Sequence, residues 1–165
     1  MFTVGIITSS DKGSKGDRED VSGAVIKDMV EKKEYKVIKQ IILPDEKDIL
    51  TNEMKYMADE LKVDLVLTTG GTGFSKRDVT PEATIKVCDR MANGIAEAIR
   101  FYSLSITPRA MLSRAVSGIR GETLIINLPG SPKAVKEALE YALDSIDHGL
   151  EILTGRASEC GRHGD

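Results

Sequence analysis

The sequence predicts an α/β protein whose open, mostly parallel sheet carries helices on both faces. Short apolar runs alternate along the chain with longer stretches of helical period. Three of the runs contain VGII, LVL and LII, which are continuously apolar rather than alternating. Continuous runs are typical of strands that are buried on both faces of a parallel sheet. Strands that alternate with helices are joined by right-handed crossovers, which predicts a doubly wound sheet.

Five short apolar runs are the predicted strands, and the fourth is the weakest. They span Phe2–Thr8, Val37–Leu43, Leu65–Thr69, Ala115–Ile119 and Leu124–Leu128. No internal repeat or linker interrupts the series. We therefore expect one domain over residues 1–154 and a flexible tail over residues 155–165.

Apolar residues at helical spacing predict the helices between these strands. They share a face in each helix, and we interpret these faces as parts of the core rather than as functional surfaces. The face residues are Val21, Val25 and Met29 in the first helix, Leu50, Met54, Met57 and Leu61 in the second, and Val135, Ala138, Leu139, Ala142, Ile146, Leu150 and Leu153 in the last.

Composition and charge exclude several classes of function. The chain has 23 basic and 26 acidic residues, a net charge of -3, and only 4% aromatic residues. It therefore lacks the basic field and the stacking side chains of a nucleic-acid-binding protein. No apolar run approaches the roughly 18 residues of a membrane span, and the N-terminus has no signal-peptide pattern. We expect a cytoplasmic protein that binds neither nucleic acid nor membranes.

The cysteines and histidines do not form a recognisable site. Cys88 and Cys160 lie far apart without zinc or disulfide spacing. His148 falls in the last helix and His163 in the tail, so neither follows a strand. The chain has no GxxxxGK[ST] and no GxSxG motif, and Lys76 stands where the dinucleotide fingerprint needs its last glycine.

The loop after the third strand, TTGGTGFSKRDVTPEA, is interpreted as the main part of a site for a phosphate-bearing ligand. In open α/β sheets, ligands bind outside the carboxyl ends of the strands. Gly70, Gly71 and Gly73 permit positive φ angles and let backbone N–H groups approach a ligand. The charged run Lys76–Asp78 serves no helical face, which favours a functional role for the loop.

Two strand-end loops are followed by the same helix-start pattern. Thr80–Pro81 and Ser131–Pro132 each read as an N-cap followed by a first helical proline, with Lys133 behind the second pair. The N–H groups and dipole at a helix start attract anions. Two such starts indicate two anionic groups bound side by side, although a turn like NLPGSP is equally common without a ligand.

The loop after the first strand is long and polar, which places it at the surface or around a ligand. It carries Ser9, Asp11 and Ser14. Asp11, Asp45 and Asp78 each follow a predicted strand, so three acids meet at one sheet edge. They would repel one another unless a cation joined them, and Mg²⁺ is the natural candidate because it binds one or two carboxylates together with phosphates. Asp45 has an alternative role as the N-cap of the helix that follows it.

The strings TTGGTGFSKRDVTPEAT, AMLSRAVSGI and LPGSPKAV closely resemble the molybdopterin-binding family of molybdenum cofactor biosynthesis. The similarity runs from about Val4 to about Leu153, and SSDKGSKGDREDVSG resembles the first loop of the adenylyltransferase branch. The resemblance implies a three-layer α/β/α fold, usually in a homotrimer. It also implies that ATP and molybdopterin react with Mg²⁺ to give adenylyl-molybdopterin and pyrophosphate.

The resemblance implies roles for individual residues. Asp45 and Asp78 match two aspartates that are essential to adenylation in the family, and we expect them to hold Mg²⁺. Lys76 and Arg77 are expected to neutralise phosphate charge. The residues expected to contact nucleotide or pterin are Ser9, Asp11, Ser14, Gly70, Gly71, Thr72, Gly73, Thr80, Pro129, Gly130, Ser131 and Lys133.

Two alternatives remain open at this point. The family contains paralogues that bind pterin without evident adenylation, and its fold also occurs in molybdate-inserting enzymes and in a group of nucleotide pyrophosphatases. A molybdate-inserting enzyme is also the expected recipient of the product. The sequence does not distinguish a molybdenum from a tungsten end product. If the chain forms a trimer, the helix over residues 95–102 and the segment over 110–119 are the candidate interface.

Overall fold

The sheet has six strands in the order β2-β1-β3-β6-β5-β4 in the computed structural model, which describes residues 1–157. The strands β1, β2, β3 and β6 run parallel, and β5 pairs antiparallel with both β6 and β4. The prediction of a mostly parallel sheet is therefore confirmed. The strands are β1 (Thr3–Ser9), β2 (Lys36–Leu43), β3 (Leu65–Thr69), β4 (Arg90–Met91), β5 (Ser117–Arg120) and β6 (Thr123–Leu128).

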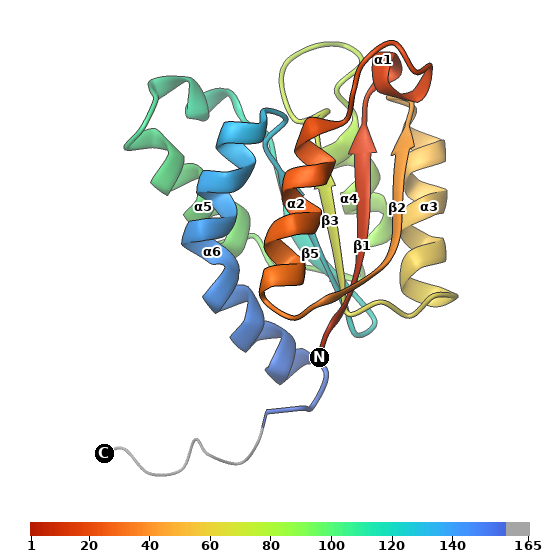
Figure 1. Cartoon of the computed structure of the whole chain (residues 1–165), viewed down its shortest axis with the longest axis vertical. Helices are drawn as coiled ribbons and strands as arrows, with labels where there is room; N and C mark the ends of the chain where they lie inside the picture. Colours follow the sequence, from red (N-terminus) through yellow and green to blue (C-terminus); the bar gives the residue numbers. More distant parts are fainter. Residues whose placement is uncertain (158–165) are drawn as a thin grey trace.

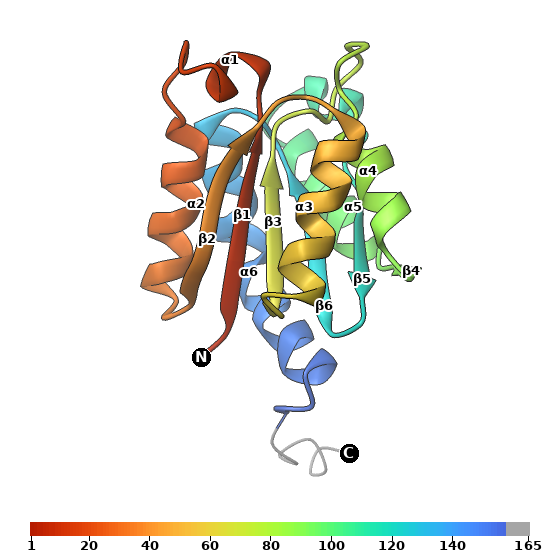
Figure 2. The same ribbon diagram turned by 90° about the vertical axis from the view of Figure 1, so that its right-hand side faces the viewer.

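Helices cover both faces of the sheet, which confirms the three-layer α/β/α arrangement (Figure 1). On one face α2 packs against α6 and α6 against α5, and on the other α3 packs against α4 (Figure 2). The helices are α1 (Asp11–Ser14), α2 (Val21–Lys32), α3 (Lys47–Asp59), α4 (Thr80–Val87), α5 (Gly94–Leu104), the 3₁₀ helix η1 (Pro108–Leu112) and α6 (Pro132–Leu153).

Successive residues of the central strands belong to two separate cores. In β3, Leu65 and Leu67 pack under α2, α5 and α6, while Val66 packs under α3 and α4. In β1, Ile6 and Ile7 divide in the same way. Every residue of β3 is buried, because helices exclude water from both faces of the sheet. This is the physical reason why the runs are continuously apolar.

The buried face of α2 differs by one position from the predicted one. Ile26 and Val30 are fully buried, whereas Val21 is 46% exposed. The Ser22 hydroxyl donates to the carbonyl oxygen of Gly130 at 2.7 Å, so this side of the helix turns toward the sheet. The predicted faces of α3 and α6 are confirmed, except that Leu61 lies beyond the end of α3.

Short elements were missed by the sequence prediction. The helix α1 has four residues and β4 has two, too few for any hydrophobic period to show. The weak fourth run is a strand, β5, but it joins the sheet through a tight turn at Gly121, whose φ is 57°. It therefore runs antiparallel to β6 rather than through a crossover.

The C-terminal part of α6 lies at the amino ends of the strands, far from the loops at the top of Figure 1. Arg156 forms an ion pair with Asp64 and lies over the ring of Phe2. Cys160 and His163 fall outside the described residues, so the flexible tail over 155–165 stays a prediction. None of the helices within residues 1–157 is both long enough and apolar enough to cross a membrane.

We predict that Leu67→Ala lowers the free energy of unfolding by about 2–5 kcal/mol, because it opens a cavity between the strand and the α2–α6 layer. Leu67 is 0% exposed. Ile152→Ala on α6 is the control, since Ile152 is 62% exposed and its loss should change stability by no more than about 0.5 kcal/mol. Denaturant unfolding measures both, and equal losses would contradict the assigned core.

Candidate functional site

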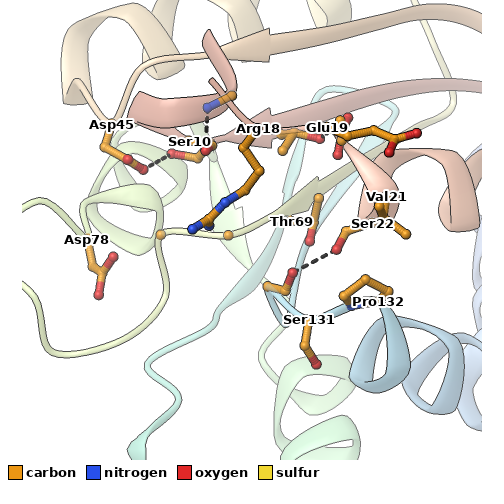
Figure 3. A pocket seen from close by; sticks show the side chains of 17 residues that line it. Ser10, Arg18, Glu19, Val21, Ser22, Asp45, Thr69, Asp78, Ser131 and Pro132 are labelled. Carbon is orange, nitrogen blue, oxygen red and sulfur yellow. Dashed lines mark hydrogen bonds between the residues drawn. The ribbon is translucent and has the colours of Figure 1, made fainter. Parts of the chain in front are cut away.

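A cavity of about 600 Å³ opens at the carboxyl ends of the strands, where β1 is flanked by β2 on one side and β3 on the other. This is the switch point of the sheet, at which ligands of open α/β proteins bind. The volume suits a nucleotide-sized ligand. Figure 3 shows its lining side chains converging from four strand-end loops. The predicted site residues that line it are Ser9, Asp45, Gly70, Gly71, Asp78, Gly130 and Ser131.

The other predicted site residues lie around the cavity rather than in its wall. Thr72 and Pro129 line a second, smaller cavity of about 230 Å³ that shares Gly130 with the first. Lys76 lines a further hollow beside α4, which shares Asp78 with the main cavity. The predicted residues outside the main cavity wall are Asp11, Ser14, Thr72, Gly73, Lys76, Arg77, Thr80, Pro129 and Lys133.

The carboxylate of Asp45 is held by the loop that follows β1. It accepts a hydrogen bond from the Ser9 hydroxyl at 2.5 Å and another from the backbone N–H of Asp11 at 2.9 Å. In return, the backbone N–H of Asp45 donates to the Asp11 carboxylate at 3.0 Å. The N-cap alternative for Asp45 is wrong, because Glu46 occupies that position. The reciprocal bonds instead fix Asp45 at the cavity edge.

Arg77 joins three loops outside the cavity. Its guanidinium donates two hydrogen bonds of 3.0 Å to the Asp11 carboxylate and one of 2.8 Å to Glu46. These hydrogen bonds from Arg77 hold the pKa of Asp11 below its ordinary value. We expected a cation to offset the charge of three neighbouring acids. At Asp11 the positive charge comes from the Arg77 side chain. Within the described residues no group of three or more potential ligand side chains gathers for a metal ion.

The glycine turn depends on residues without a β-carbon. Gly70 and Gly71 have φ angles of 87° and 71°, as predicted, whereas Gly73 is not among the glycines with positive φ. A β-carbon on Gly70 would lie 2.5 Å from the backbone oxygen of Ser9, and one on Gly71 would overlap the Thr80 hydroxyl. The turn can thus approach β1 only because glycine stands there.

Thr80 anchors this turn instead of capping α4. The N-cap is Val79, so the predicted N-cap role of Thr80 is wrong. The buried Thr80 hydroxyl donates to the carbonyl oxygen of Gly70 at 3.0 Å. At the other helix start the prediction is confirmed, since the Ser131 hydroxyl accepts a hydrogen bond from the backbone N–H of Ala134.

Arg114 holds the loop that carries Asp78, and its role escaped the sequence prediction. Its guanidinium donates to the carbonyl oxygens of Gly73 and Asp78, each at 2.7 Å, and pairs with Glu82. The Asp78 carboxylate accepts the N–H of Ser75 at 3.0 Å. The only sequence signal for Arg114 was its place in the string AMLSRAVSGI.

Arg18, Glu19 and Asp20 also line the cavity, although none of them was among the predicted site residues. Asp20 caps α2 by accepting the N–H of Gly23 at 2.8 Å. In Figure 3 the Arg18 side chain reaches from its loop into the middle of the lining residues. The available signal was the charged string DRED inside an otherwise polar loop.

A family model and an individual protein that match this sequence are both named for molybdopterin. A sequence family described as "Probable molybdopterin binding domain" matches residues 5–148. A protein of Helicobacter pylori (strain J99) named molybdopterin adenylyltransferase is 43% identical over 156 residues, which cover 92% of this chain and 88% of that protein.

Solved structures are similar over nearly their whole length. The molybdopterin biosynthesis enzyme MoaB of Thermus thermophilus matches with a TM-score of 0.89 and 45% identity, covering 94% of this chain and 98% of that one. The tungsten cofactor synthesizing protein MoaB of Pyrococcus furiosus matches with a TM-score of 0.84 and 36% identity, covering 92% and 96%.

We predict that Gly70→Ala destabilises the protein more than Gly121→Ala does. Both glycines have positive φ, but a β-carbon on Gly121 would have nothing within 4 Å. Gly121→Ala should therefore cost only the backbone strain of about 1–2 kcal/mol. Gly70→Ala adds a clash with the Ser9 backbone. Denaturant unfolding separates the two, and equal costs would show that the turn tolerates a β-carbon.

We predict that Arg77→Leu raises the pKa of the Asp11 carboxyl toward its ordinary value, because the two guanidinium hydrogen bonds are lost. The pair stabilises the fold above an aspartate's ordinary pKa, near 4, and this contribution disappears as the pH falls through the lowered pKa. Carboxyl NMR titration measures the shift. Lys76→Leu is the control in the same loop, and an unmoved Asp11 in Arg77→Leu would refute the pairing.

Proposed function

The chain belongs to the molybdopterin-binding family of molybdenum cofactor biosynthesis, and we propose that it transfers AMP from ATP to the terminal phosphate of molybdopterin. The products are adenylyl-molybdopterin and pyrophosphate. The observation that carries this proposal is the pair of carboxylates, Asp45 and Asp78, in the wall of one nucleotide-sized cavity at the switch point. The molybdopterin adenylyltransferase of Helicobacter pylori supports it by name.

The reaction needs positioning and charge neutralisation more than proton transfer. A phosphate monoester has a second pKa of about 6, so the terminal phosphate of molybdopterin is already a good nucleophile at neutral pH. One of its oxygens forms a bond to the α-phosphorus of ATP while the bond to the bridging oxygen breaks and pyrophosphate leaves. No general base is required, which agrees with the position of His148 on α6 and outside the cavity wall.

Asp45 and Asp78 fit the ligand preference of Mg²⁺. This ion takes one or two carboxylates together with substrate phosphates and water rather than a cage of protein ligands. Within the described residues, no three or more potential ligand side chains lie close enough together to hold a metal ion by themselves, which agrees with such a partly filled set. When bound, the ion would neutralise charge that builds up on the phosphates. The protein's own part is to hold Asp45 through Ser9 and Asp11, and Asp78 through Arg114.

Two adjoining cavities suit a reaction between two substrates. We assign the larger cavity to the nucleotide and the smaller one, which contains Thr72 and Pro129, to the pterin. They share the wall at Gly130, so ligands in them meet beside the glycine turn. Arg100 lines the smaller cavity and is held by the carbonyl oxygens of Ser113 and Ala115.

The proposal extends to a cytoplasmic homotrimer that passes its product to a molybdate-inserting enzyme. Support for self-association comes from five exposed apolar residues on α5, on η1 and in the turn between them, since exposed apolar residues close together in a chain can mark an interface. They are Phe101, Leu104, Ile106, Met111 and Leu112. The relative from Pyrococcus furiosus is named for tungsten and the one from Thermus thermophilus for molybdopterin, so both metals stay within the proposal.

The deciding experiment incubates the protein with molybdopterin, ATP and Mg²⁺ and measures both pyrophosphate and adenylylated pterin. We expect equal amounts of the two products. Binding of molybdopterin without release of pyrophosphate would contradict the proposal and identify a binding protein. Hydrolysis of a dinucleotide in the absence of pterin would identify a pyrophosphatase.

We predict that Asp78→Asn and Asp45→Asn each slow pyrophosphate release by about 100-fold or more, the usual scale for removing one group that stabilises a charged transition state. Asp17→Asn is the matched control, because Asp17 lies on the first loop but outside the cavity wall. The free energy of unfolding is measured for all three. A folded Asp78→Asn protein with the wild-type rate would rule out the assigned role.

A further inference from the structure

The charged side chains that line the main cavity are all acidic apart from one. Glu19, Asp20, Asp45 and Asp78 all line it, and Arg18 is the sole basic residue among the lining residues that the structure describes. A triphosphate brings several further negative charges into this space. The acidic side chains repel the phosphates and make their binding less favourable, so a bound triphosphate needs cations that face the cavity.

The basic residues that the sequence suggested for this task do not line the main cavity. Arg77 is paired with Asp11 and Glu46. The side chain of Lys133 is 83% exposed, and its Nζ atom lies 3.9 Å from Glu137, which lines the smaller cavity. Lys76 faces the hollow beside α4. None of these three side chains belongs to the wall of the main cavity.

The loop that carries Arg18 is held in place by hydrogen bonds, while the Arg18 guanidinium itself has no partner within residues 1–157. Its loop is fixed on one side by the N–H of Asp17, which donates to the carbonyl oxygen of Lys12 at 2.9 Å. On the other side Asp20 accepts a hydrogen bond from the Thr8 hydroxyl at 2.8 Å and caps α2. Over residues 1–157, the Arg18 guanidinium makes no ion pair and no hydrogen bond with another residue, while it extends into the cavity (Figure 3).

We propose that Arg18 binds the phosphates of the nucleotide and is the cation that this chain itself contributes to the cavity. The inference rests on the proposed function and names a residue for it. A guanidinium presents paired N–H donors that match two phosphate oxygens, and its charge persists at all physiological pH values. It offsets the acidic wall while Asp45 and Asp78 stay free to bind a divalent cation. Arg18 therefore selects for phosphate rather than for the nucleoside.

The test compares the affinities of adenosine, AMP, ADP and ATP for the wild-type protein and for Arg18→Ala, by calorimetry in the presence of Mg²⁺. We expect an unchanged affinity for adenosine and a loss that grows with the number of phosphates, reaching about 10-fold or more for ATP, the scale of one charge-assisted contact. Arg18→Lys should recover part of the loss, because it restores the charge without the paired donors.

Lys15→Ala is the matched control, since Lys15 is a basic residue on the same loop outside the cavity wall. Its nucleotide affinities should equal those of the wild type. Equal losses for adenosine and ATP in Arg18→Ala would show a disturbed loop and overturn the assignment, as would no loss at all.

The two proposals fail separately. A wild-type protein that releases pyrophosphate with molybdopterin, alongside an Arg18→Ala protein of unchanged ATP affinity, would refute the role of Arg18 and leave the reaction standing. A wild-type protein that binds ATP through Arg18 but releases no pyrophosphate would refute the adenylyl transfer alone. A wild-type protein that binds no ATP would refute both.

Discussion

The close approach of the Gly70 turn to the end of β1 is the constraint on which the site depends. Gly70 can lie against the carbonyl oxygen of Ser9 only because it has no β-carbon. The Thr80 hydroxyl then ties Gly70 to α4, and the Thr69 hydroxyl ties the same strand end to the carbonyl oxygen of Pro129 at 2.6 Å. This close contact and the two hydroxyl hydrogen bonds thus fix the loops that follow the neighbouring strands β1, β3 and β6 at one edge of the sheet.

Near this contact, the hydrogen-bond partners of each charged side chain determine whether it faces the cavity or points away from it. Asp11 and Asp45 share reciprocal backbone hydrogen bonds, yet only Asp45 lines the cavity, while Asp11 pairs outward with Arg77. The outward pair relieves the repulsion between two neighbouring carboxylates. It also removes Arg77 from the set of groups that could meet a phosphate, which is why the inward-facing Arg18 becomes important.

The sequence predicted the central strands and the glycine turn after β3 well, because both depend on local signals. Burial on two faces leaves a continuous apolar run, as in β3, and a turn with positive φ requires glycine at positions such as Gly70. It failed where the outcome depends on partners distant in the chain. Thr80 is a residue type that often caps helices, but its hydroxyl donates to the carbonyl oxygen of Gly70 instead. Arg77 is a residue type that often binds phosphate, but its guanidinium donates to the Asp11 carboxylate. Nothing local in the sequence shows that Arg18 faces the cavity.

The acidic wall has a thermodynamic consequence for the order in which ligands can bind. With Glu19, Asp20, Asp45 and Asp78 in its wall, the cavity favours cations and opposes the binding of a polyphosphate without a cation. A divalent cation bound by carboxylates lowers that opposition, and a bound polyphosphate in turn adds oxygen ligands for the cation. Each therefore raises the affinity of the other by the same factor. Under the proposed function, Arg18 supplies a fixed share of the positive charge and therefore sets how strongly the binding of the nucleotide depends on the metal ion.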